Sequence, residues 1–160
     1  MKLQGVKLVI GIGNPGKEYE KTYHNVGFLF VDYLDGCQMS NVKCQMSKSD
    51  VFMNQSGDFV AGALKKYRVK PEEILIVHDD SDIELGKYKL SFGRGSAGHK
   101  GAESIIKSLG AKNFWRLRIG VRPQKSKQKA EKFVLKKITA ANLKILNQVF
   151  EKTNKNSSVS

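Results

Sequence analysis

Apolar residues fall in short runs along the chain, and the spacing of these runs predicts alternating strands and helices. Residues 4–12 and 74–78 are rich in Val, Leu and Ile, which is typical of strands that are buried on both faces. Residues 87–92 and 114–121 alternate between apolar and polar positions, which predicts two more strands. Residues 51–53 form a shorter strand candidate.

A helical period separates several of these strands. Within residues 25–34 the apolar side chains fall at positions i, i+3, i+4 and i+7, and Gly36 follows as a stop. Further helices are predicted over residues 58–67, over residues 102–109 before Gly110, and from an N-cap at Thr139 through Phe150. Residues 38–50 are polar without a period and are expected to form an irregular connection, and residues 153–160 are expected to be frayed.

This alternation predicts one α/β domain over residues 1–160, with a mixed, mostly parallel twisted sheet flanked by helices. In such sheets the ligand crevice lies beyond the carboxyl ends of the strands. The segments that follow the predicted strands are therefore the places to look for chemistry: residues 11–25, 51–57, 78–82 and 93–101.

The composition is that of a soluble globular protein, with 40% apolar and 27% charged residues. No apolar run approaches the length of a membrane span, and the start of the chain lacks the features of a secretory signal, so a cytosolic protein is expected. The two cysteines, Cys37 and Cys44, have neither CxxC spacing nor nearby histidines, so we expect no zinc site and no disulfide.

The net charge of +13 lies almost entirely in the last third of the chain. Residues 1–99 hold 13 basic against 12 acidic residues, whereas residues 100–160 hold 15 against 3. A segregated basic surface favours a phosphate-rich polyanion as partner, although a solvated basic tail would give the same count.

Two glycine-rich segments suggest phosphate binding. Residues 11–16 match GxGxxG after a strand, but Pro15 and the polar run behind it delay the helix that should face a pyrophosphate, so no nucleotide cofactor is expected. Residues 93–101 lack the Lys-Ser/Thr pair of a Walker loop. They can still present backbone N–H groups to an oxygen anion, or form a plain turn.

Polar side chains at the strand ends offer a candidate for water activation. The three histidines are His24, His78 and His99, and Asp79 follows a strand at the same predicted sheet edge as His24. A histidine with a carboxylate partner is the minimum apparatus for general-base catalysis. No GxSxG elbow, suitably placed Cys or spaced metal ligands are found, so neither an acyl-enzyme nor a catalytic metal is expected.

Five motifs occur in order within residues 6–140. They are GIGNPG (11–16) with Tyr19 and TYHNVGF (22–28), FMNQSG (52–57), VHDDSD (77–82) with LGK (85–87), GSAGHKG (95–101), and RLRIGV (116–121). In this order they resemble the motifs of the bacterial-type peptidyl-tRNA hydrolases. One such motif would be weak, but five in sequence are highly specific.

The resemblance implies hydrolysis of the ester between a peptide or N-blocked aminoacyl group and the 3′-terminal ribose of tRNA, without metal or cofactor. It implies that His24 is the catalytic base and that Asp79 orients the imidazole ring or favours its charged form. Asn14 and Asn54 would position substrate and water, Tyr19 and Met53 would line the cleft, and Lys89 and Arg118 would grip the terminal 5′-phosphate. The basic last third would hold the acceptor stem. A monomer that does not contact membranes is expected.

Several positions depart from the family pattern. Lys100 stands where the family usually has Asn, and it brings a full positive charge that cannot accept a hydrogen bond. We expect it to stabilise a developing oxyanion or the terminal phosphate. Tyr23 replaces the usual Arg, Glu84 replaces a Pro, and the connection between Phe28 and Phe52 is short, which predicts a reduced rim over the peptide.

These departures leave an alternative open: a catalytically weak RNA-binding module on the same fold. Such a module would have little reason to keep the side chains that the resemblance assigns to catalysis and substrate binding. This chain keeps all four of them: His24, Asp79, Asn14 and Asn54.

Overall fold

The computed structural model describes residues 5–37, 44–123, 125 and 129–157. Its centre is one five-stranded sheet in the order β2-β1-β3-β5-β4. The strands are β1 (Leu8–Gly11), β2 (Gln45–Lys48), β3 (Ile74–Glu84), β4 (Tyr88–Phe92) and β5 (Trp115–Arg122). Neighbouring strands run parallel except for the antiparallel pair β4 and β5. The predicted α/β class with a mixed, mostly parallel sheet is therefore confirmed.

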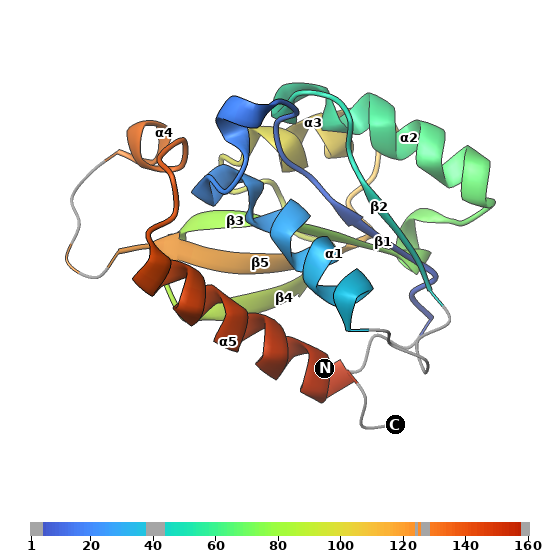
Figure 1. The fold of residues 1–160 in the computed structure, drawn as a ribbon. Coiled ribbons are helices and arrows are strands. Elements are labelled where there is room, and N and C mark those ends of the chain that lie inside the picture. The colour runs from blue at the N-terminus through green and yellow to red at the C-terminus, as the bar shows by residue number, and fades with distance from the viewer. Residues whose placement is uncertain (1–4, 38–43, 124, 126–128, 158–160) are drawn as a thin grey trace.

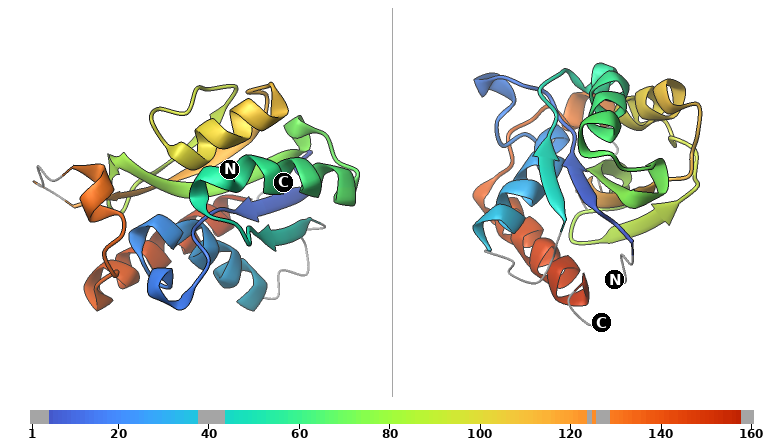
Figure 2. Two further views of the ribbon diagram at one scale, coloured as in Figure 1. Left: turned by 90° about the horizontal axis from the view of Figure 1, so that it is seen from above. Right: turned by 90° about the vertical axis from the view of Figure 1, so that its right-hand side faces the viewer.

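Helices cover both faces of this sheet (Figure 1, Figure 2). On one face lie α1 (Val26–Gly36) and α5 (Ala140–Ser157), and on the other lie α2 (Ser56–Tyr67) and α3 (Lys100–Leu109). Successive residues of β1 and β3 point into two separate apolar clusters, one under each helix layer. This burial on both faces explains why these two strands have nearly continuous apolar sequences. No helix of the described residues is both long and apolar enough to cross a bilayer.

Two expectations for residues 38–53 are wrong. Residues 45–48 form strand β2, which pairs with β1 at the edge of the sheet, although an irregular connection was expected there. Residues 51–53 are not a strand, because they bend into the 3-10 turn Met53–Gln55. An edge strand with exposed Gln45 and Lys48 carries too few apolar positions to show a period. Residues 38–43 lie outside the described residues.

The last helix is longer than its sequence pattern predicted. Thr139 caps it as expected, since its Oγ1 accepts a bond from the Asn142 N–H at 3.2 Å. The helix then continues beyond Phe150 to Ser157, so residues 153–157 are helical where a frayed tail was expected. Thr153 is buried there, and residues 158–160 lie outside the described residues. Shorter pieces complete the chain: η1 (Lys17–Tyr19), η2 (Tyr23–Asn25), η4 (Pro71–Glu73) and α4 (Ala130–Phe133).

Candidate active site

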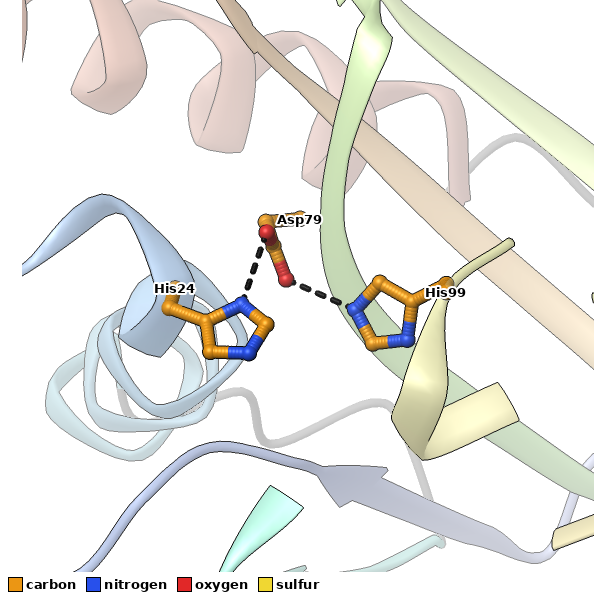
Figure 3. Close-up of side chains that lie close together, drawn as sticks. All are labelled: His24, Asp79 and His99. Carbon is orange, nitrogen blue, oxygen red and sulfur yellow. Dashed lines mark hydrogen bonds and ion pairs between the residues drawn. The ribbon is translucent and has the colours of Figure 1, made fainter. Parts of the chain in front are cut away.

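Three segments that are distant in the sequence meet at the carboxyl end of the sheet. His24 comes from the turn before α1, Asp79 from β3, and His99 from the residue that caps α3. The Nδ1 of His24 lies 2.9 Å from Asp79 Oδ2, and the Nε2 of His99 lies 2.8 Å from Asp79 Oδ1 (Figure 3). Each carboxylate oxygen therefore faces one imidazole, and the predicted pair His24–Asp79 is in contact.

The hydrogen bonds assign a proton to each ring. His99 Nδ1 accepts a bond from the Ala102 N–H at 3.2 Å, so the proton of the neutral ring is on Nε2 and is donated to Asp79. His24 Nδ1–H donates to the other carboxylate oxygen, which leaves the Nε2 lone pair of His24 available. Asp79 thus fixes the orientation and the tautomer of the candidate base.

Asp79 is almost fully buried, and its charge depends on these two histidines. Burial alone would raise the pKa of the carboxyl group. The charges and N–H bonds of His99 and His24 outweigh this effect and hold the pKa of Asp79 well below its ordinary value. The carboxylate is therefore ionised at neutral pH.

Glycine residues allow the turn that bears His24 to approach the sheet. A Cβ on Gly27 would overlap the carbonyl oxygens of Val77 and Ile12, and a Cβ on Gly11 would overlap the backbone of Gly27. The start of α1 consequently packs directly against β1 and β3. Gly11, part of the GxGxxG pattern, therefore has a packing role that places His24 beside Asp79.

The basic C-terminal part of the chain also holds this turn. The His24 N–H donates to Val134 O at 2.7 Å, and Tyr23 N–H donates to Lys136 O at 3.2 Å. Tyr23 is buried, packs its ring 4.6 Å from that of Phe133, and accepts a bond from the Asn142 amide. Tyr23, at the position where the family usually has Arg, thus joins the turn to the segment between α4 and α5.

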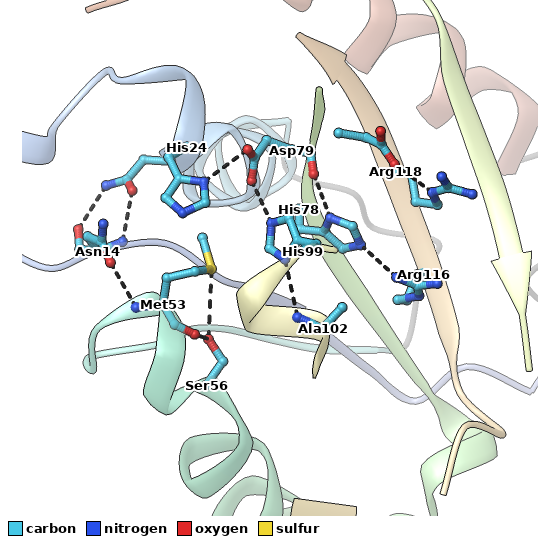
Figure 4. Close-up of polar contacts among 12 residues, drawn as sticks. Asn14, His24, Met53, Ser56, His78, Asp79, His99, Ala102, Arg116 and Arg118 are labelled. Carbon is cyan, nitrogen blue, oxygen red and sulfur yellow. Dashed lines mark hydrogen bonds and ion pairs between the residues drawn. The ribbon is translucent and has the colours of Figure 1, made fainter. Parts of the chain in front are cut away.

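Asn14 is fixed by three hydrogen bonds next to His24 (Figure 4). Its backbone N–H and C=O are both bonded to the side chain of Asn25, at 2.8 and 2.9 Å. Its Oδ1 accepts from the Met53 N–H at 2.7 Å. Because the oxygen is engaged, the group that Asn14 can offer a substrate is its amide N–H₂.

A cleft of about 810 Å³ runs past these groups. The predicted residues His24, Asp79, Asn14, Met53, Asn54 and Lys100 all line it. His99 lines it as well, with apolar walls from Phe52 and Leu135. Tyr19 stands outside this set, and its ring packs edge-on against Phe52 at 6.2 Å.

The two predicted phosphate contacts do not line the cleft themselves, and they lie side by side on β4 and β5. Lys89 is directly opposite Arg118 in the strand register. Arg118 is already engaged, since its Nε donates to Asp80 Oδ2 at 2.7 Å and its Nη1 donates to Ser91 at 3.3 Å. A phosphate at this position would therefore share the guanidinium with a carboxylate.

His99 is the residue of the candidate site that the sequence reasoning missed. It was noted as one of three histidines, but its contact with Asp79 depends on the path of the loop 93–98, which has no period to interpret. His78 has a different position: it is fully buried, and its Nδ1–H donates to the Asp79 carbonyl at 2.6 Å. Burial, aided by His99, holds the pKa of His78 well below its ordinary value, so its ring is neutral.

The site was also compared with the requirements of a metal ion. His24, Asp79 and His99 each offer one ligand atom, and these atoms lie within 4.8 Å of one another. A metal on His99 Nε2 would drive the ring proton to Nδ1, where it would point at the Ala102 N–H. The donor set therefore fits a hydrogen-bonded network better than a metal centre.

The fold and the site together define an α/β protein with a carboxylate-oriented histidine in a cleft. A family model described as peptidyl-tRNA hydrolase matches residues 8–159, and the chain belongs to this family. The peptidyl-tRNA hydrolase of Aquifex aeolicus is 38% identical over 164 residues, which cover 92% of this chain and 85% of the relative. That of Nitratidesulfovibrio vulgaris is 43% identical over 140 residues, covering 71% and 69%.

Solved structures agree with this assignment. The crystal structure of peptidyl-tRNA hydrolase from Acinetobacter baumannii matches with a TM-score of 0.81 and 32% identity, covering 92% of this chain and 84% of that chain. A hydrogenase maturation protease from Thermococcus kodakarensis matches with a TM-score of 0.54 at 14% identity, which shows a shared fold alone. The family resemblance predicted from the five motifs is confirmed.

Proposed function

We propose that this protein hydrolyses the ester bond between a peptide or N-blocked aminoacyl group and the 3′-terminal ribose of tRNA. The observation that carries the proposal is the histidine in the cleft. His24 has Nδ1 fixed on a buried carboxylate, and within the part of the chain that the structure describes its Nε2 has no such partner. An imidazole oriented in this way can accept the proton of a water molecule while that water attacks a carbonyl carbon.

In the proposed reaction, His24 Nε2 removes a proton from a water molecule as its oxygen attacks the ester carbonyl carbon. The carbonyl oxygen becomes an oxyanion in the tetrahedral intermediate. When the intermediate collapses, the bond to the ribose oxygen breaks, and this oxygen recovers the proton from His24. The products are a free carboxylic acid and tRNA with an intact 3′ end. Asp79 stabilises the transient imidazolium, and general-base help of this kind is typically worth about 10²–10⁴-fold in rate.

Donors for the oxyanion are available on both sides of the base. The amide N–H₂ of Asn14 and the side chain of Asn54 lie in the cleft. The first N–H groups of α3, including those of Lys100 and Gly101, have no partner within the helix and carry its positive dipole. The Lys100 ammonium adds a full charge at the same helix end. A carbonyl oxygen placed between these groups would be stabilised by hydrogen-bond donors that are already oriented when its negative charge develops.

The distribution of charge along the chain supports tRNA as the partner. The last third of the chain, with 15 basic and 3 acidic residues, would hold the acceptor stem of the tRNA. Lys89 and Arg118 would bind its terminal 5′-phosphate, with Arg118 shared with Asp80. The reaction needs neither metal nor cofactor, and we propose a cytosolic monomer.

The deciding experiment measures release of N-blocked amino acids from tRNA by wild type, His24→Ala and Asp79→Asn. We expect losses of at least 10²-fold in kcat for both variants. As a matched control, Asp35→Asn changes an exposed carboxylate in α1 that does not line the cleft, and its activity should stay within about twofold of wild type. Wild type, His24→Ala and Asp79→Asn should bind tRNA with similar affinity. Equal rates for wild type and His24→Ala would contradict the proposal, and tRNA binding without hydrolysis by wild type would favour the RNA-binding module.

A further inference from the structure

Arg116 on β5 is a buried charge without a carboxylate partner. It is the largest of the fully buried side chains, with 1% of its surface exposed. Among the ion pairs of the described residues, none includes Arg116, whereas Arg118 two positions along the strand pairs with Asp80. A buried guanidinium costs several kcal/mol unless its donors are satisfied. Its place in the fold therefore calls for a reason other than general stability.

The acceptors around Arg116 come from the loop before α3 and from β3, and Figure 4 shows the contact with His78 of β3. Its Nη2 donates to the carbonyl oxygens of Gly95 and, at 3.4 Å, Arg94 in the loop before α3. Its Nη1 lies 3.5 Å from Nε2 of His78, the residue directly before Asp79 in β3. One planar group thus reaches both the loop and the strand.

The loop of residues 93–98 has few other ties to the sheet. Within the described part of the chain, its remaining hydrogen bonds stay inside the loop or run from His99 to Ser96. Three of its residues, Gly93, Ala97 and Gly98, have positive φ, and most of the loop is exposed. The guanidinium of Arg116 therefore fastens this loop to β5, which carries Arg116, and to β3, which carries His78.

Fastening the loop also fixes the catalytic geometry. The loop ends at His99, whose ring donates to Asp79 and lies 4.2 Å from the ring of His78. His78 is itself held by its bond to the Asp79 carbonyl. A shift of the loop would therefore move His99 away from one carboxylate oxygen and leave Asp79 free to turn away from His24.

We propose that Arg116 is a positioning residue for the reaction: it clamps the loop 93–98 to β3 and so sets the contact of His99 with Asp79. Arg116 touches neither the cleft nor the reacting atoms. Its effect on rate rests on the proposed hydrolysis, but its effect on His99 does not.

The test compares wild type with Arg116→Met and Arg116→Lys, using two readouts. The first is the imidazole ¹⁵N–¹H NMR spectrum, in which wild-type His99 should show one fixed tautomer with a proton on Nε2. The second is the hydrolysis of peptidyl-tRNA, resolved into kcat and KM. For Arg116→Met we expect averaged His99 signals and a fall in kcat of roughly 10–100-fold with KM nearly unchanged. Arg116→Lys, which can reach one acceptor at a time, should fall between.

The control is Arg68→Met, the same substitution at an exposed position at the end of α2, outside the basic last third of the chain. It should leave both readouts as in wild type. If Arg116→Met does not fold, Arg116→Lys decides the question alone. If a folded Arg116 variant kept the single His99 tautomer of wild type, the proposed positioning role of Arg116 would be wrong. An unchanged kcat in such a variant would contradict this role as well. If wild type itself failed to hydrolyse the substrate, the proposed function would fall while the NMR readout still tested the clamp.

Discussion

At the scale of single residues, the site is defined by which hydrogen-bond donors and acceptors are already in use. Asp79 has both oxygens occupied, His99 has both ring nitrogens occupied, and Asn14 has its oxygen occupied. His24 Nε2 and the Asn14 amide remain for a substrate. Lys100 adds a group that no member of this network pairs with in the described contacts, which makes its role separable by mutation.

Lys100→Asn restores the residue that the family usually has at this position. If the ammonium binds a tRNA phosphate, KM should rise several-fold, and the slope of log KM against log salt should fall by about one unit. If it binds the oxyanion, kcat should fall while the salt slope stays constant. Steady-state rates at four salt concentrations separate the two roles. Lys65→Asn, at an exposed position of α2 outside the basic last third of the chain, serves as the control. Unchanged kcat, KM and slope in Lys100→Asn would exclude both roles.

At the scale of elements, the approach of α1 to β1 and β3 determines where His24 lies. This approach leaves no room for a side chain at Gly27, whereas Gly62 in α2 faces open space. The two glycines therefore provide opposite outcomes for the same substitution.

Gly27→Ala should lower the free energy of unfolding by about 1–3 kcal/mol, because the added methyl group must push α1 away from the strands. The activity should fall as well, since the displaced helix carries the turn that contains His24. Gly62→Ala should instead raise the free energy of unfolding by roughly 0.5–1 kcal/mol, through the better helix propensity of Ala. Urea denaturation measures both. An equal stability for the two variants would mean that α1 does not need the close approach.

Some elements of the fold can be predicted from the sequence, and others cannot. Buried strands such as β3 and capped helices such as the one after Thr139 carry their own local signals, namely apolar runs and a side-chain cap. Strand β2 has no such signal, because at an edge its stability comes from backbone pairing with β1 and not from its side chains. The contact of His99 with Asp79 was equally hidden, since it depends on where a glycine-rich loop is fastened.

At the scale of the whole molecule, the buried ionisable groups link folding to pH. His78 has a native pKa well below its ordinary value of 6.5, and Asp79 has one below its ordinary 3.8. In both cases the unfolded chain binds the proton more readily than the folded chain. The stability from each group is therefore complete above the unfolded pKa and is lost as pH falls below it, first for His78 and then for Asp79.

His78→Gln should remove the upper part of this pH dependence. In wild type, the free energy of unfolding should fall as the pH drops below 6.5, by up to about 1.4 kcal/mol per pH unit for one extra proton bound by the unfolded chain. In His78→Gln the slope between about pH 5 and 6.5 should be smaller, although its absolute stability is lower. Chemical denaturation at several pH values gives both slopes. Parallel slopes would show that folding does not lower the pKa of His78.

The cap of α3 has a consequence for how the site responds to acid. The same ring nitrogen of His99 that receives the Ala102 N–H is the nitrogen that a second proton would occupy. A doubly protonated His99 would therefore release the first turn of α3, together with the N–H groups and the Lys100 charge that this turn presents to the cleft. The Nδ1 of His99 can therefore serve as the cap of α3 only while it carries no proton.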